Sequence, residues 1–173
     1  MMEFIRCKRA QQREVEDLYE GAVSSLLAGT NWPQWSSDYP RSAVAAAIRS
    51  GEQYAALDDT GQIVGAVMLG EDPGADYSLG SWQRDLRSGE FLAVHALAAA
   101  GEARGRGIGR FLLEGCIEEA RSGGYRAVRL DIVPENEPAR RLYTGRGFQP
   151  AGMADLRRGL PQVPLWELFE YNL

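Results

Sequence analysis

The chain has 173 residues, of which 45% are hydrophobic and 25% charged, and its formal net charge is −5. This length and composition predict one globular domain that buries enough apolar surface to fold without a disulfide or a metal ion. The acidic balance argues against a nucleic-acid partner, and no apolar run has the length that a membrane span or a signal peptide requires. We therefore expect a cytoplasmic protein with neither a nucleic-acid nor a membrane partner.

Cysteine and histidine are too few to suggest a metal centre. Cys7 and Cys116 lie far apart in the sequence and form no CxxC pair, so both are expected to pack as small apolar side chains. His95 is the single histidine and cannot build a site of several histidines. The sequence therefore predicts no metal site.

The first part of the chain predicts a strand, two helices and a loop between the helices. Residues 4–7 form a short strand, and apolar residues within 15–27 then recur at the three- and four-residue spacing of an amphipathic helix. Residues 29–39 hold two tryptophans among Pro, Ser and Asn residues, which is typical of a loop. A second helix starts at residues 38–40 and ends at Gly51.

A hairpin and a long loop follow. Residues 54–57 and 63–69 predict two strands joined by a glycine-containing turn. Residues 71–90 contain three glycines, a proline and isolated aromatic residues without clear periodicity, so we predict a long loop. Long loops within compact domains often carry function.

The second half of the chain predicts alternating strands and helices. Strands are expected at 91–98, 125–133 and 165–171, and helices at 108–121 and 137–146. The complete order of elements, with one more strand between the helix at 137–146 and the last strand, is β-α-α-β-β-β-α-β-α-β-β. This order is typical of an α/β domain with a mixed sheet.

A glycine-rich loop, Arg104 to Gly109, lies between a predicted strand and a predicted helix. Its three glycines let the backbone turn tightly and approach a ligand closely. The following helix directs free N–H groups and its positive dipole end into the loop, and two arginines flank the glycines. The arrangement favours a phosphate, although a flexible turn before a helix explains the same residues.

The spacing of the loop excludes two common phosphate-binding motifs. A P-loop needs Gly, four residues and then Gly-Lys-Ser/Thr, and the chain has no such run. A dinucleotide fingerprint needs glycine at its sixth position, which is Arg110 when the count starts at Gly105. That fingerprint also follows the first strand of its fold, whereas this loop lies late in the chain.

A second segment, residues 136–148, follows the next predicted strand. Asn136 is a favourable helix N-cap, and Pro138 stands where the first helical turn tolerates proline. Tyr143 shares a helix face with Ala139. Taken alone, this segment describes a capped helix with a core tyrosine.

Together the two segments resemble the GNAT superfamily of N-acetyltransferases. The family shows Arg or Gln, two residues, Gly, one residue and then Gly or Ala, which matches Arg104, Gly107 and Gly109. Residues 95–99 look like a His-Arg-Leu-Ala-Val strand of many bacterial members, with alanine at the arginine and valine positions. The family also shows Asn, two residues, Ala, three residues, Tyr and then Gly-Phe. The residues that match this pattern are Asn136, Ala139, Tyr143, Gly147 and Phe148.

The resemblance implies a single GNAT-like α/β domain over residues 1–173. Its mixed central sheet would have about six to seven strands with flanking helices. A V-shaped opening between two parallel strands would hold acetyl-CoA, the co-substrate. The backbone of residues 97–99 would pair with the pantetheine arm, and Asn136 would contact the pantetheine or the thiol region. The implied cofactor-binding residues are Leu97, Ala98, Ala99, Arg104, Gly105, Arg106, Gly107, Ile108, Gly109, Arg110 and Asn136.

The implied reaction is the direct attack of an amine on the thioester. A backbone N–H within residues 97–99 would polarise the thioester carbonyl, and Tyr143 matches the position of the family's general acid. Some relatives carry a strand glutamate where this chain has Ala93, so the base is open. His95 shares a strand face with Ala93 by two-residue alternation and is a candidate base, because histidine titrates near neutral pH. A structural role explains His95 equally well, and the alternatives are a water chain, Asp131 and Glu90.

The acceptor is expected to be a small-molecule or peptide amine bound by the loops at 29–39 and 71–90. Three other functions stay open: a non-catalytic acyl-CoA sensor, transfer of a longer acyl group, and an interaction module that uses Trp32, Trp35 and Trp82. A homodimer is also open, since the last strand could pair with a second copy across an edge of the sheet.

Overall fold

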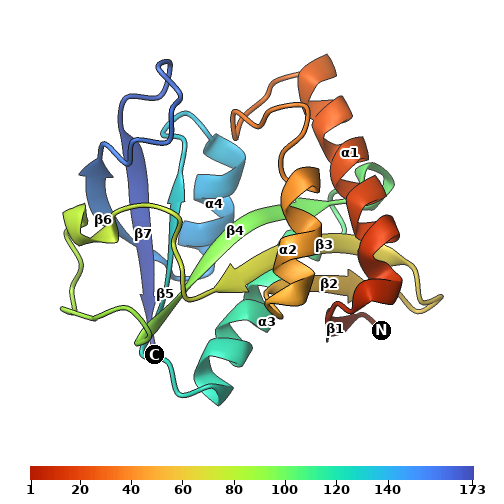
Figure 1. Cartoon of the computed structure of the whole chain (residues 1–173), viewed down its shortest axis with the longest axis horizontal. Helices are drawn as coiled ribbons and strands as arrows, with labels where there is room; N and C mark the ends of the chain where they lie inside the picture. The colour runs from red at the N-terminus through yellow and green to blue at the C-terminus, as the bar shows by residue number, and fades with distance from the viewer. The chain divides into compact units, whose positions relative to one another are not determined.

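The computed structural model describes residues 1–173 and contains a seven-stranded sheet in the order β1-β2-β3-β4-β5-β7-β6 (Figure 1). β4 and β5 pair in parallel, whereas β1–β2, β2–β3, β5–β7 and β6–β7 pair antiparallel. The mixed sheet confirms the predicted α/β fold class. The strands are β1 (Glu3–Arg6), β2 (Gln53–Leu57), β3 (Ile63–Gly70), β4 (Phe91–Ala99), β5 (Ala127–Ile132), β6 (Gln149–Ala154) and β7 (Trp166–Asn172).

Four α-helices occupy the segments in which the sequence predicts them. Short 3-10 turns precede α1 and α2, and the predicted hairpin, formed by β2 and β3, turns at Gly61 with a φ of 82°. None of the helices combines the length and the apolar character needed to cross a bilayer. The helices are α1 (Gln12–Ala28), α2 (Val44–Arg49), α3 (Ile108–Ser122) and α4 (Glu137–Gly145).

The last strand is not an edge of the sheet. β7 pairs with β5 on one side and with β6 on the other, so its backbone groups are already used for pairing. The expectation that this strand could pair with a second copy is therefore wrong. The strands at the two edges are β1 and β6.

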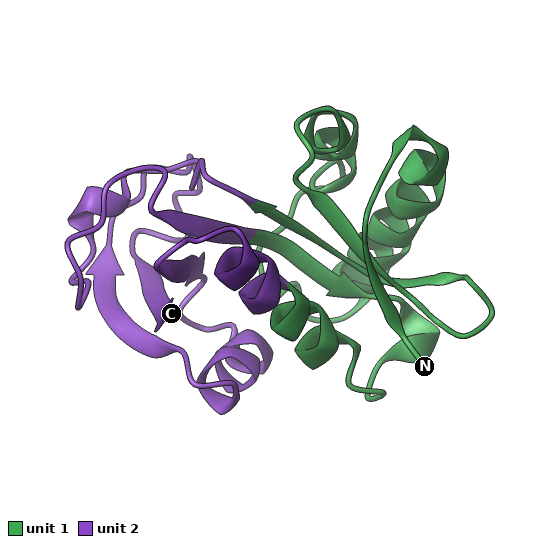
Figure 2. Ribbon diagram, turned by 90° about the horizontal axis from the view of Figure 1, so that it is seen from below, with its two compact units in different colours: residues 1–69, 95–115 green, residues 70–94, 116–173 purple.

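The chain forms two compact units (Figure 2). Unit 1 comprises residues 1–69 and 95–115, and unit 2 comprises residues 70–94 and 116–173. Each unit has its own cluster of buried apolar side chains.

One face of α1 is buried in unit 1. Val15 and Tyr19 are both 0% exposed, and Ala22 and Val23 continue the same face. Leu27 belongs to this face by its spacing, yet it lies in the largely exposed last turn of α1 and is itself 56% exposed.

Both cysteines behave as the sequence predicts. Cys7 and Cys116 are buried and form no disulfide. Burial raises the pKa of the Cys7 thiol to about 12 and raises the pKa of Cys116 as well. Both thiols are therefore neutral and pack as apolar groups.

Unit 2 contains a buried arginine that the sequence analysis missed. Arg129 lies on β5, is 1% exposed, and has its guanidinium carbon 4.2 Å from the ring centre of Trp82 and 4.5 Å from that of Phe91. Its Nη2 donates to the carbonyl of Arg84 at 2.7 Å, and its Nε lies 3.8 Å from Oε2 of the buried Glu170. Burial lowers the pKa of Arg129, and the charge of Glu170 opposes that shift.

Arg129→Leu is expected to lower the free energy of unfolding by about 3–5 kcal/mol, because Glu170 is then a buried charge without its counterion. Urea unfolding followed by circular dichroism measures this loss. Arg121→Ala is the control, since its ion pair with Glu118 is exposed (54% and 66%) and is worth less than about 1 kcal/mol. Equal losses in the two variants would contradict the structural role of Arg129.

The segment from 71 to 90 is a loop, as predicted, with one 3-10 turn at Tyr77–Leu79. Tyr77 is 4% exposed, its ring stacks on Phe91, and its hydroxyl donates to Oδ1 of Asp131 at 2.6 Å. Tyr77 is therefore a core residue of unit 2. The loop also borders a cavity of about 470 Å³, whose aromatic lining is Tyr77, Trp82 and Phe91.

Candidate functional site

The glycine-rich loop is a left-handed turn that opens α3. Gly105 and Gly107 have φ angles of 77° and 78°, which residues with a side chain rarely adopt. α3 begins at Ile108, and its first main-chain bond to the loop runs from the N–H of Phe111 to the carbonyl of Gly107 at 3.0 Å. The N–H of Arg106 already donates to the carbonyl of Ala103 at 3.3 Å, whereas the N–H groups of residues 107–110 have no such main-chain bond and are available to an anion.

Gly65 on β3 lets the start of α3 pack closely against β3 within unit 1. A Cβ on Gly65 would collide with Cγ2 of Ile108 and would lie 2.9 Å from Cδ1 of Leu112. The missing side chain lets these two residues of α3 pack directly on β3. Nothing in the sequence singles out Gly65, because only the packed structure shows what a side chain there would meet.

Three exposed arginines surround the turn. Arg110 is bound to Glu114 one turn along α3, with 2.9 Å between Nε and Oε1. Arg106 contributes to lowering the pKa of Asp58, although the hydroxyl of Thr60 is the main cause. Arg104 and Arg106 place positive charge within the loop. The charge of Arg110 is partly neutralised by its ion pair with Glu114.

The predicted pantetheine-binding residues lie on the C-terminal part of β4. The parallel pairing of β4 with β5 extends from Phe91↔Ala127 to Ala93↔Arg129. Leu97 to Ala99 lie beyond this paired stretch of β4. Ala96, just before them, has a φ of 52°, so the regular alternation that would place His95 and Leu97 on one face is interrupted.

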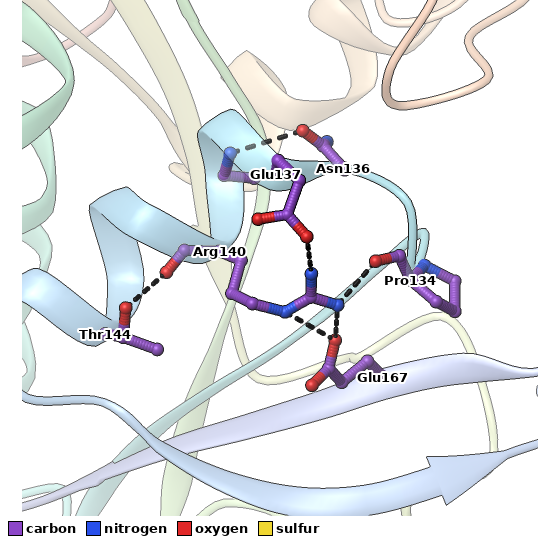
Figure 3. Close-up of polar contacts among 7 residues, drawn as sticks. Pro134, Asn136, Glu137, Arg140, Thr144 and Glu167 are labelled. Atoms are coloured by element: carbon purple, nitrogen blue, oxygen red, sulfur yellow. Dashed lines mark hydrogen bonds and ion pairs between the residues drawn. The ribbon is translucent and has the colours of Figure 1, made fainter.

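The second predicted segment forms α4 with the expected cap (Figure 3). Oδ1 of Asn136 accepts from the N–H of Ala139 at 3.2 Å, and Asn136 is 8% exposed. Pro138 lies in the first turn, as the sequence predicts. The Nδ2 group of Asn136 is not needed for the cap.

Arg140 holds the start of α4 against β7, which the sequence analysis missed (Figure 3). Its guanidinium donates to the carbonyl of Pro134 and forms ion pairs with Glu137 and Glu167. The three-residue spacing of Glu137 and Arg140 is a signal that the sequence contained. Glu167 on β7 has no such signal, since it is distant in the sequence.

Tyr143 lies one turn further along α4 and is 7% exposed. Its ring centre is 5.7 Å from that of Phe148, so the two aromatic residues of the sequence motif pack together. Burial is the main cause that raises the pKa of Tyr143, and Cys116 and Asp131 add to it. The hydroxyl therefore carries its proton at neutral pH, and the raised pKa makes it a weaker acid than an exposed tyrosine.

The two carboxylates considered as bases are both occupied. Asp131 accepts from the hydroxyl of Tyr77 and, at 2.5 Å, from Nη2 of Arg158. Glu90 accepts from the N–H of Arg87 at 2.7 Å, which is the main cause that lowers its pKa. The lowered pKa makes Glu90 a weak base, and Oδ1 of Asp131 is already bound by two donors. His95, which is half-buried on β4, remains the candidate base.

The aromatic residues of the two loops are mostly packed. The ring of Trp35 contacts Tyr19 and Tyr39 edge to face, and Trp82 covers Arg129. Trp32 is the exposed one of the three tryptophans, at 38%. This packing speaks against an interaction surface built from Trp32, Trp35 and Trp82. The structure places no group of three or more His, Cys, Asp or Glu side chains that could hold a metal ion.

Comparison with known proteins identifies the family. A family model described as the acetyltransferase (GNAT) family matches residues 15–148, which include both parts of the site. The chain belongs to this family. The protein is thus an acetyltransferase, and the resemblance found in its sequence motifs is confirmed. A search of curated protein sequences finds no match to the chain.

Solved structures share the fold of this acetyltransferase at low sequence identity. An acetyltransferase of the GNAT family from Streptococcus agalactiae is 19% identical, with a TM-score of 0.78 over 99% of this chain and 95% of that one. A GCN5-related N-acetyltransferase from Kribbella flavida is 17% identical, with a TM-score of 0.72 over 99% and 98% of the two chains. A putative acetyltransferase from Salmonella typhimurium, solved with its cofactor acetyl-CoA, is 19% identical, with a TM-score of 0.67 over 100% and 94%.

Proposed function

We propose that this acetyltransferase moves the acetyl group of acetyl-CoA to a primary amine of a small molecule or a peptide. The observation that carries the proposal is the left-handed turn at Gly105 and Gly107, which presents the N–H groups at the start of α3. The Salmonella structure, solved with acetyl-CoA, supports the choice of cofactor. We also propose that residues 1–173 act as one catalytic domain of a cytoplasmic protein. A homodimer formed through the sheet would use β1 or β6.

Each part of the site has a role in holding the cofactor. Within Gly105 to Gly109, the N–H groups other than that of Arg106, which is bound to Ala103, would bind the pyrophosphate of coenzyme A, and Arg104 and Arg106 would add charge. The backbone of Leu97 to Ala99 would pair with the pantetheine arm. Nδ2 of Asn136, which the helix cap leaves available, would donate to the pantetheine or the thiol region.

The reaction needs two proton transfers. The neutral amine nitrogen attacks the thioester carbonyl carbon, and a backbone N–H of β4 stabilises the oxyanion that forms. The carbon–sulfur bond then breaks, and the leaving sulfur takes the proton of the Tyr143 hydroxyl. The nitrogen loses its extra proton to His95 or to water. The products are the acetylated amine and coenzyme A.

A screen of amines with the purified full-length chain tests the proposal. Acetyl-CoA is expected to raise the melting temperature, and a true acceptor is expected to raise it further and to release free thiol. Mass spectrometry of the acceptor then identifies the acetylated amine. Binding of acetyl-CoA without thiol release for any amine would favour a sensor. Faster release from a longer acyl-CoA would overturn the acetyl donor.

Variants of Asn136 separate its cap from its proposed contact with the cofactor. Asn136→Asp keeps the oxygen that caps α4, so its unfolding free energy should stay within about 0.5 kcal/mol of wild type. Asn136→Ala removes the cap and should cost about 1 kcal/mol. Both variants lack Nδ2, so calorimetry should find weaker acetyl-CoA binding in both. Normal affinity in Asn136→Asp would limit Asn136 to capping the helix.

A further inference from the structure

An unusual backbone conformation interrupts β4 within unit 1. Ala96 has a φ of 52°, in the left-handed region where a Cβ is unfavourable. The residue is 9% exposed, so neither solvent nor a loop end explains the conformation. A strained residue of this kind persists only where its surroundings hold it in place.

The hydroxyl of Tyr19 holds Ala96. This buried side chain comes from α1, is 0% exposed, and donates to the carbonyl of Ala96 at 2.7 Å. The buried carbonyl would otherwise lack this partner, and such groups are costly to leave unpaired. The tyrosine therefore compensates part of the strain at Ala96.

A buried glutamine fixes the direction of that hydrogen bond. Nε2 of Gln53, which is 0% exposed, shares its two hydrogens among three acceptors: the hydroxyl oxygen of Tyr19 at 3.3 Å and the carbonyls of Tyr54 at 3.2 Å and Val67 at 3.1 Å. A tyrosine hydroxyl has a single hydrogen. Because Gln53 approaches the oxygen as a donor, that hydrogen is directed to Ala96. Trp35 then covers the ring of Tyr19, with 6.4 Å between ring centres.

The same hydrogen bond determines where the next N–H points. The carbonyl of Ala96 and the N–H of Leu97 belong to one planar trans peptide, so they point in opposite directions. When Tyr19 binds the carbonyl, the N–H of Leu97 is directed away from Tyr19. Leu97 is the first of the three residues expected to face the cofactor.

We propose that Tyr19 is a positioning residue, which holds the Ala96–Leu97 peptide so that the N–H of Leu97 donates to the thioester carbonyl of acetyl-CoA. This inference rests on the proposed function. A donor that is already oriented stabilises the oxyanion without a cost of reorganisation during the reaction.

Removing one oxygen tests the role of Tyr19. Tyr19→Phe is expected to lower kcat about 10- to 100-fold, because the donor is then no longer held in position. Ala96→Gly alone gives the reference rate for the double variant, since glycine adopts a positive φ without penalty. In the double variant, Ala96→Gly should restore most of the activity that Tyr19→Phe loses. Tyr54→Phe is the matched control, because it removes another buried tyrosine hydroxyl of unit 1, bound to Nε of Arg6 at 3.0 Å.

Infrared spectroscopy provides a readout that does not depend on an acceptor. Acetyl-CoA, isotope-labelled at its carbonyl and bound to the full chain, should show a lower carbonyl stretching frequency in wild type than in Tyr19→Phe. Tyr54→Phe should match wild type, and Ala96→Gly should restore the low frequency in the double variant. A purely structural role of Tyr19 would lower stability without moving this band.

The outcomes separate this proposal from the proposed function. If the wild type is active but Tyr19→Phe changes neither the band nor kcat, the role of Tyr19 alone is overturned. The role is also overturned if Tyr19→Phe lowers kcat equally with alanine and with glycine at position 96. A wild type that acetylates no amine overturns the proposed function, while the infrared comparison still decides the role of Tyr19. If Tyr19→Phe does not fold, Gln53→Met keeps the hydroxyl but removes the group that directs it. An unchanged band in Gln53→Met then overturns the proposal.

Discussion

Gly107→Glu is expected to weaken acetyl-CoA binding at least about 100-fold, or about 2.7 kcal/mol, and to leave the fold intact. No atom lies within 4 Å of a Cβ at this position, so steric collision within the protein is not the reason. The reasons are the φ of 78°, which costs a side chain about 1–2 kcal/mol, and a negative charge placed beside the proposed pyrophosphate. Isothermal titration calorimetry with acetyl-CoA measures the loss.

Gly101→Glu is the matched control for this prediction. It introduces the same charge six residues earlier in the chain, where a Cβ also has no atom within 4 Å. The φ of Gly101, however, lies outside the left-handed region. Its affinity for acetyl-CoA should stay within about threefold of wild type, since exposed charges are screened by salt. Equal losses in the two variants would mean that charge alone explains the effect. Normal binding by Gly107→Glu would remove the pyrophosphate from this loop.

Tyr143→Phe is expected to lower kcat about 100- to 10,000-fold with a small change in KM, because the leaving sulfur loses its proton donor. The ring and its contact with Phe148 are retained, so the fold should be unaffected. Steady-state rates of thiol release measure the effect. Tyr125→Phe is the control, since it removes an exposed hydroxyl that donates to Glu71 at 2.7 Å.

The pH dependence gives a second test of Tyr143. Burial raises its pKa above the ordinary tyrosine value of about 10, so the hydroxyl keeps its proton below that pH. Tyr143 should therefore cause no alkaline loss of kcat below about pH 10. Unchanged turnover in Tyr143→Phe would exclude it as the general acid. A wild-type alkaline limb near pH 8 that is absent in Tyr143→Phe would contradict the raised pKa.

Local features of the site could be read from the sequence because they depend on neighbouring residues. The cap of α4 joins Asn136 to Ala139, three positions apart, and the turn before α3 needs only the conformational freedom of Gly105 and Gly107. Helix and strand positions followed from spacing for the same reason. Leu27 shares the helical spacing but is exposed, because spacing alone does not tell where the core ends.

Contacts between distant residues could not be read in this way. The bond from Tyr19 to Ala96 joins residues 77 positions apart, and the ion pair of Arg140 with Glu167 spans 27 positions. Arg129 looks like a solvated strand residue until Trp82 and Glu170 are placed beside it. Neither periodicity nor composition contains that information.

The sequence by itself determined the family and the α/β class, and it predicted the segments proposed to hold the cofactor, because each depends on short motifs and local periodicity. The tertiary structure decided that Asp131 and Glu90 are held by hydrogen bonds, that β7 is an inner strand, and that Ala96 is strained. These features depend on which distant groups meet, and burial then sets their charge and conformation. The position of Tyr19 beside Ala96 is of this kind, and it determines where the N–H of Leu97 points.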